Sequence, residues 1–261
     1  MERSIEHPIE RVIDAMQANL GDRITIDDMA RIAMFSKFHF SRIFRHSTGV
    51  SPGRFLSALR LQEAKRLLTA TSLSVADISN QVGYSSVGSF SSRFKRSVGV
   101  APSVYRANGG LPVRLAAENR RRAAGKTMAT VRGEVGSTRI MAGPIFVGLF
   151  PEPIPQGSPV CCAILGRPGP YALENVPQGT WHVLVYAGGQ DGQPGITAGP
   201  LGDGRVPAIG AHGPIVVRKE TAFVNGADVR LRPLSPFDPP ILLAPHEPDP
   251  LPAAGPQFVA G

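Results

Sequence analysis

The sequence has little cysteine and no long apolar run. Its only two cysteines, Cys161 and Cys162, are adjacent, which excludes a disulfide framework and fits a reducing compartment. Neighbours in a strand point to opposite faces, so we expect both to be packing residues rather than ligands of one metal. No run reaches the roughly 18 apolar residues that span a bilayer, and the first residues lack an apolar segment. We therefore expect a cytoplasmic protein that makes no membrane contact.

Signatures of catalysis and metal binding are scarce as well. His182, His212 and His246 are scattered without the spacing of a metal site. There is no Gly-x-Ser-x-Gly nucleophile motif, and no phosphate-binding loop precedes a helical pattern. We expect no enzyme, no metal and no cofactor.

Proline is rare in the first half, since 21 of the 25 prolines lie after residue 126. Proline breaks helices, and 261 residues suffice for two domains, so the halves should differ in architecture. We expect an all-α tandem helix-turn-helix domain over residues 1–107, a basic linker over 108–126 and an all-β sandwich over 127–261.

The net charge of +8 is unevenly distributed. Residues 1–107 hold 15 Lys and Arg against 9 Asp and Glu, residues 108–126 hold 5 against 1, and the remainder holds 8 against 10. All of the excess positive charge therefore lies before residue 127. Such a distribution favours contact with a polyanion through the first half, although a solvated basic surface is the alternative.

An internal repeat is the most informative feature of the first half. Residues Thr25–Met29 match Ser74–Ile78 at an offset of 49, and Gly49–Pro52 match Gly99–Pro102 at an offset of 50. Apolar spacing predicts a helix behind Pro8 and a longer helix after Pro52. The longer helix would join two copies of one small helical unit.

Each copy has the spacing of a helix-turn-helix. The first unit is predicted as helices over 26–33 and 36–45, and the second as helices over 75–82 and 85–96. In the first unit Phe40 and Phe44 fall on one helical face, which leaves a polar and basic face free. Such a face can enter the DNA major groove, whereas a solvated helical hairpin is the alternative for a single unit. Two units on a stiff helix favour the DNA interpretation, because they can enter groove segments about 34 Å apart.

Four segments carry a family resemblance. The segments Ser74–Ser86, Phe90–Lys95 and Gly99–Arg106 resemble the signature of AraC/XylS-type transcription regulators, and Ser36–Phe44 resembles the partner helix-turn-helix of that family. The resemblance runs from about Ile9 to Arg106. It implies an unusual order, with the DNA-binding domain first.

The resemblance also implies DNA contacts for individual residues. In the first unit they are base contacts from Phe38, Ser41 and Arg42, with Lys37 and Arg45 nearer the phosphates. In the second unit they are contacts from Ser86, Val87, Ser89 and Ser92. Ser92 stands where the family often has Arg, and Gly88 weakens the helix. We therefore predict that the first unit supplies most of the sequence discrimination, while Lys95 and Arg96 contact phosphates.

The second half alternates short apolar runs with glycine and proline. The runs are 145–150, 160–165, 171–174, 181–187, 215–217, 229–231 and 241–243. Their spacing suits an antiparallel sandwich or barrel of about seven strands. The stretch from Gly169 to Tyr186 resembles transthyretin-like and carboxypeptidase regulatory-type sandwiches, and we expect that fold. Phe146, Trp181 and Tyr186 could line a ligand cavity in it, although core packing is the alternative.

The sequence predicts a DNA-binding transcription regulator that is not an enzyme and is controlled by a small-molecule effector on its second domain. Two alternatives stay open: the second domain only forms a homodimer, or it carries an unrecognised enzymatic activity. RNA polymerase is a further expected partner if the protein activates transcription. The linker cations either add phosphate contacts or are solvated; they are Arg114, Arg120, Arg121, Arg122 and Lys126.

Overall fold

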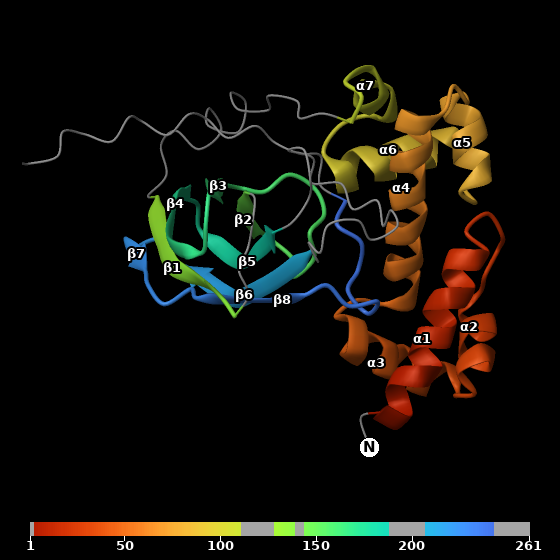
Figure 1. Cartoon of the computed structure of the whole chain (residues 1–261), viewed down its shortest axis with the longest axis horizontal. Coiled ribbons are helices and arrows are strands. Elements are labelled where there is room, and N and C mark those ends of the chain that lie inside the picture. Colours follow the sequence, from red (N-terminus) through yellow and green to blue (C-terminus); the bar gives the residue numbers. More distant parts are fainter. Residues whose placement is uncertain (1–2, 111–127, 139–143, 188–206, 243–261) are drawn as a thin grey trace, which may run out of the picture.

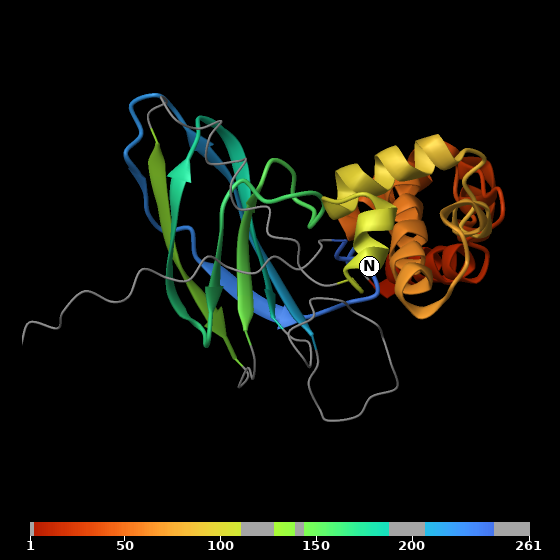
Figure 2. The same cartoon turned by 90° about the horizontal axis from the view of Figure 1, so that it is seen from above.

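The computed structural model describes residues 3–110, 128–138, 144–187 and 207–242 (Figure 1). A helical half comes first and a strand-rich half follows it (Figures 1 and 2). The linker cations named above and His246 lie outside the described residues. Among the helices that the structure describes, none is long and apolar enough to cross a membrane.

The helical half contains the two repeated units and the elements around them. Its helices are α1 (Arg3–Ala18), α2 (Ile26–Ala33), α3 (Lys37–Thr48), α4 (Pro52–Ala70), α5 (Val75–Gln81), α6 (Val87–Val98) and α7 (Pro102–Ala107). From here on the first unit is α2 with α3, and the second unit is α5 with α6. The prediction that Pro8 lies in the first turn of its helix is wrong, because α1 begins five residues earlier.

The same local chemistry builds both units. Thr25 and Ser74 cap α2 and α5, and each forms a reciprocal capping box with the aspartate three residues later. Gly49 and Gly99 then end α3 and α6 in the left-handed conformation that glycine tolerates best. The duplicated sequence has therefore produced a duplicated structure.

Each unit has its own aromatic core against α4 or α7. Phe40, Phe44 and Phe55 stack edge to face in the first unit, with ring centroids 5.5 and 5.4 Å apart. Phe94 and Tyr105 repeat the contact in the second unit at 5.6 Å. These rings are buried, and burying them fixes which face of α3 and of α6 points outward.

The strand-rich half forms one eight-stranded sheet in the described residues. Its strands are β1 (Ala129–Ser137), β2 (Ile145–Phe150), β3 (Cys162–Leu165), β4 (Gly169–Val176), β5 (Gly179–Ala187), β6 (Ala208–Val217), β7 (Phe223–Val224) and β8 (Val229–Pro233). The order is β3-β2-β5-β6-β8-β1-β4, and β7 pairs with β1. Strand β1 runs parallel to β7 and β8, whereas the other pairs are antiparallel.

The expected sandwich is therefore wrong. A sandwich needs two separate sheets, but β8 pairs with both β6 and β1 and so joins all strands into one sheet. The strands at the two ends of the order, β3 and β4, contact each other, which nearly closes the sheet into a barrel. The predicted strand at 241–243 is also wrong, because residues 241 and 242 form no strand.

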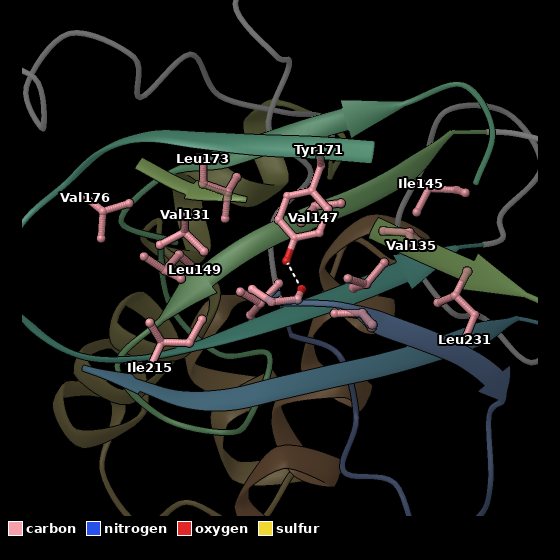
Figure 3. Packing of buried hydrophobic residues seen from close by; sticks show 14 of the residues in the cluster. Val131, Val135, Ile145, Val147, Leu149, Tyr171, Leu173, Val176, Ile215 and Leu231 are labelled. Carbon is pink, nitrogen blue, oxygen red and sulfur yellow. Dashed lines mark hydrogen bonds between the residues drawn. The ribbon is translucent and has the colours of Figure 1, made fainter. Parts of the chain in front are cut away.

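Apolar side chains fill the inside of the curved sheet (Figure 3). Val131 and Val135 from β1 meet Val147 from β2 and Leu173 from β4, and all four are buried. The hydroxyl of Tyr171 donates a hydrogen bond to the carbonyl of Ala227, which satisfies this polar group inside the core (Figure 3). Cys161 also packs against this core, but Cys162 is exposed, so the expectation of a packing role is wrong for Cys162.

Candidate nucleic-acid interface

The outer face of α3 carries the side chains predicted to contact DNA in the first unit. Phe38 is 87% exposed, which is unusual for a large apolar side chain and leaves it free to contact a partner. Arg42 and Arg45 are also exposed, and Ser41 is half-buried. The five predicted residues therefore share the surface opposite Phe40 and Phe44; they are Lys37, Phe38, Ser41, Arg42 and Arg45.

Local contacts orient several of these side chains. The Ser41 hydroxyl donates to the carbonyl of Lys37 at 2.9 Å, so its lone pairs remain able to accept. Lys37 forms an exposed ion pair with Asp27 at 3.1 Å, which competing phosphates can replace because surface pairs are weak. Arg42 Nη2 lies 3.4 Å from His39 Nδ1. Arg42 is thus held across the α3 surface with most of its donors free.

The second unit presents a less basic and more hydroxylated face. Val87 is 40% exposed, and Ser86, Ser89, Ser92, Lys95 and Arg96 are all exposed as well. The Ser86 hydroxyl accepts a hydrogen bond from the Ser89 amide and so caps α6. Its hydroxyl hydrogen and its second lone pair remain available for a partner. The Ser92 side chain is shorter than that of Arg42, carries no charge and has one donor instead of several. This face can therefore make fewer direct contacts with base edges.

Both second helices contain cations and no carboxylate. Helix α3 carries Lys37, Arg42 and Arg45, and α6 carries Arg93, Lys95 and Arg96. The carboxylates of the two units lie instead in the first turns of α2 and α5. The favourable electrostatic surface for a phosphate backbone therefore coincides with the exposed faces of α3 and α6.

Helix α4 joins the two units (Figure 1). Its 19 residues span about 28 Å, slightly less than the ~34 Å turn of the duplex. Arg60, in the middle of α4, donates to the carbonyl of Gly83 at 3.1 Å and to that of Asp22 at 2.6 Å. Burial lowers the pKa of Arg60, and the two carbonyls accept hydrogen bonds from its terminal nitrogens Nη1 and Nη2. Arg60 therefore links the α1–α2 loop and the turn of the second unit to α4.

The sequence prediction missed an open hollow beside the first unit. Its volume is about 470 Å³, and it is lined by Pro8, Arg11, Ala33, Met34, Phe35, His39, Arg42 and Ile43. Arg11 comes from α1, so no motif within the unit could have indicated it. Met34 is 80% exposed and stands in the left-handed backbone conformation at φ 60°.

The three predicted ligand-contacting residues do not line one cavity. Phe146 and Tyr186 are cross-strand partners that belong to a cluster with Ile241, whereas Trp181 packs against the core inside the sheet. Trp181 Nε1 donates to the carbonyl of Pro177 at 2.9 Å. Trp181 and Tyr186 lie an odd number of residues apart in β5, so their side chains point to opposite faces of the sheet.

Among the described residues, histidine and acidic side chains do not gather around a common point either. Within the described ranges, no group of three or more His, Cys, Asp or Glu could hold a metal ion. His212 Nδ1, in β6, lies 2.9 Å from the carbonyl of Asp228, the residue before β8, so this contact is internal to the strand-rich half.

Comparisons with known proteins match the helical half. The profile of a family described as a helix-turn-helix domain matches residues 29–108. A solved AraC-type regulator from Chromobacterium violaceum shares 29% identity and a TM-score of 0.39, over 41% of this chain and 96% of that one. The lactose operon transcription activator of Staphylococcus xylosus is 31% identical over 39% of this chain, but the match spans only 37% of the activator.

A shorter relative is covered over most of its length. The HTH-type transcriptional activator AarP of Providencia stuartii is 35% identical over 98 residues, which are 38% of this chain and 73% of AarP. The expected AraC-type resemblance of the first half is thereby confirmed. The chain belongs to the AraC-type family of helix-turn-helix transcription regulators.

Proposed function

We propose that this protein binds double-stranded DNA sequence-specifically and regulates transcription, with its two units reading consecutive segments of the major groove. One observation carries the proposal: α3 and α6 each expose a face without carboxylates, at the two ends of one continuous helix. A second helix of this kind presents side chains to base edges while the rest of its unit contacts the backbone. Two such helices in one chain read a two-part site without a second copy.

The first unit supplies most of the base discrimination in this proposal. Arg42 offers a bidentate donor pair that matches O6 and N7 of guanine, and Phe38 offers an apolar contact for a thymine methyl group. The second unit supplies phosphate contacts through Lys95 and Arg96, with Val87 as its apolar contact to a base. The serines of α6 add single hydrogen bonds, which discriminate less than a bidentate pair.

We further propose a supporting role for the strand-rich half in preference to effector sensing. Aliphatic side chains fill the inside of the sheet, and the predicted ligand-contacting aromatic residues lie in two different clusters. An effector that shifts DNA affinity must bind one state better than the other, and this requires a site in one of those states. A DNA titration with and without candidate metabolites separates the two roles, because an effector changes the affinity and an inert half does not.

The function is tested by selecting bound duplexes from a random pool with the whole chain. The expected result is a two-part sequence whose halves lie about one helical turn apart. Arg42→Ala should then lower affinity about 5- to 100-fold and abolish the preference for one guanine. Arg218→Ala, an exposed arginine of the strand-rich half, is the matched control and should bind as the wild type does. Enrichment of no sequence, or of one undivided half-site, would contradict the proposal.

A further inference from the structure

Two segments of the strand-rich half pack between the sheet and the helices. The first is the β2–β3 connection, residues 151–158, and the second is the stretch after β8, residues 234–242. Together they are called the brace here. Both segments contain side chains that are buried in the helical half, although they lie far from it in the sequence.

The β2–β3 connection contacts both helix-turn-helix units. Ile154 is 3% exposed and belongs to the core cluster of the first unit, with Phe55 and Leu59 of α4. Glu152 forms an ion pair with Arg54 in the first turn of α4. Three residues beyond Ile154, the amide of Gly157 donates to the carbonyl of Ser97 near the end of α6, at 2.6 Å.

The second segment also contacts both units. Phe237 packs against the core cluster of the first unit, whereas Leu242 is fully buried in that of the second unit. The Leu242 amide donates to the carbonyl of Pro155 at 3.2 Å, which joins the two segments of the brace. Lys65 of α4 donates to the Leu242 carbonyl at 3.4 Å.

The brace is anchored in the sheet at the same time. Ile241 packs with Phe150, Leu184 and Tyr186 of the strand-rich half, whereas its neighbour Leu242 is buried in the core of the second unit. Asp238 accepts a hydrogen bond from Arg232 of β8 at 2.7 Å and another from the Ser235 amide at 2.8 Å. The segment is therefore held at its beginning by polar contacts and at its end by apolar burial.

From these contacts we infer that Ile154, Phe237 and Leu242 are positioning residues, which fix the first and second units relative to each other for DNA reading. The inference rests on the proposed function. A displacement of one base pair moves a half-site by about 3.4 Å and rotates it by roughly 35° around the duplex axis. Two units joined only by α4 and the contacts around Arg60 and the α1–α2 loop can adjust to such a change more readily than two units that share a further rigid contact.

The brace fixes the units without covering their DNA-contacting faces. Phe38, Arg42 and Ser92 remain exposed while the brace is in place. The contacts on the second unit are made with the carbonyl of Ser97 and the buried core, not with the outer face of α6. This arrangement fits a positioning role and not an autoinhibitory one.

The test measures the spacing dependence of DNA binding by the whole chain. The duplexes are the selected two-part site, the same site with one base pair inserted between its halves, and the first half-site alone. The variants are Ile154→Ala and Leu242→Ala. The matched controls are Ile215→Ala and Leu231→Ala, which remove the same groups from the core inside the sheet. Far-UV circular dichroism checks the fold of every variant.

For the wild type and both controls, the inserted base pair should lower affinity about tenfold or more. For the brace variants the same insertion should lower affinity less than about threefold, with unchanged affinity for the single half-site. Phe237→Ala removes a side chain that is only partly buried, and it replaces Ile154→Ala or Leu242→Ala in the test if either of these fails to fold. Folded brace variants with wild-type spacing dependence would overturn the inference. A wild type that tolerates the insertion would instead contradict two-part reading itself.

Discussion

Met34 in the first unit occupies the backbone conformation that Gly83 occupies in the second. The two residues are equivalent in the repeat, and their φ angles are 60° and 80°. The turn of a helix-turn-helix thus requires the left-handed region at this position in both units. An L-residue with a side chain is disfavoured there, and glycine is not.

Met34→Gly should stabilise the protein. Met34 is 80% exposed, so the substitution loses little apolar burial. Glycine has no Cβ atom and so removes the steric cost of the left-handed conformation. The expected gain in free energy of unfolding is about 1 kcal/mol, measured by urea denaturation. A loss of stability would show that the Met34 side chain contributes more to the hollow beside α1 than its exposure indicates.

Gly83→Ala should have the opposite effect. A Cβ atom at residue 83 would lie 2.6 Å from the Leu20 carbonyl oxygen and 2.7 Å from Arg60 Nη2. It would therefore disturb the arginine that links the α1–α2 loop to this turn, in addition to straining the turn itself. We expect a loss of roughly 2 kcal/mol or more in the same denaturation experiment. Gly53→Ala in the first turn of α4 is the control, because nothing lies within 4 Å of the added Cβ.

The two units should differ in how much sequence information they read. Arg42→Ala removes a bidentate donor, whereas Ser92→Ala removes one hydroxyl. Against a panel of singly mutated sites, Arg42→Ala should lose about 1–3 kcal/mol of discrimination at one base pair, and Ser92→Ala well under 1 kcal/mol. Equal losses from both variants would mean that the second unit reads bases as strongly as the first.

Lys95 should act through phosphate alone. Lys95→Ala is then expected to weaken binding to all sequences about equally and to lower the slope of log affinity against log salt by about 1. Titrations at four or five salt concentrations measure that slope. Lys219→Ala changes an exposed lysine in the strand-rich half and should leave the slope unaltered. A sequence-dependent effect of Lys95→Ala would assign this side chain to a base instead.

The helical half was largely predictable because its signals are local. The capping boxes at Thr25 and Ser74 and the repeated Phe40 and Phe90 lie within a few residues of the structure they specify. The exposed faces of α3 and α6 follow directly from which aromatic residues are buried. The hollow that includes Arg11 was missed because it needs two helices that are distant from each other in the sequence.

The strand-rich half was predicted less well because its pattern depends on long-range contacts. Strand β1 was missed because Gly133 interrupts the apolar alternation between Val131 and Val135. A Cβ at residue 133 would lie 2.2 Å from the Ala227 carbonyl oxygen, so the fold requires the interruption. The apolar residues Ile241 and Leu242 look like part of a strand in the sequence. In the structure they form no strand, and each is buried in a different core cluster, Ile241 against the sheet and Leu242 in the helical half.

Lys65, which lies between α4 and the brace, should make the stability of the protein depend on pH. This side chain of α4 is 7% exposed, contacts the Leu242 carbonyl, and lies 5.8 Å from the centroid of the Tyr105 ring. Burial lowers the pKa of Lys65 from 10.5 to about 8, since the charged form loses its water. The unfolded chain therefore keeps this proton up to a higher pH than the folded protein does.

Lys65→Met should change how stability depends on pH. Below pH 8 Lys65 is charged in both states, and the folded protein bears the full desolvation cost of that charge. Between pH 8 and 10.5 the unfolded state binds more protons, so the wild type should gain stability with rising pH, by on the order of 3 kcal/mol relative to Lys65→Met. The measurement is the difference in free energy of unfolding between the two proteins across that range. A flat difference for Lys65→Met would mean that the lysine reaches water through an opening of the brace.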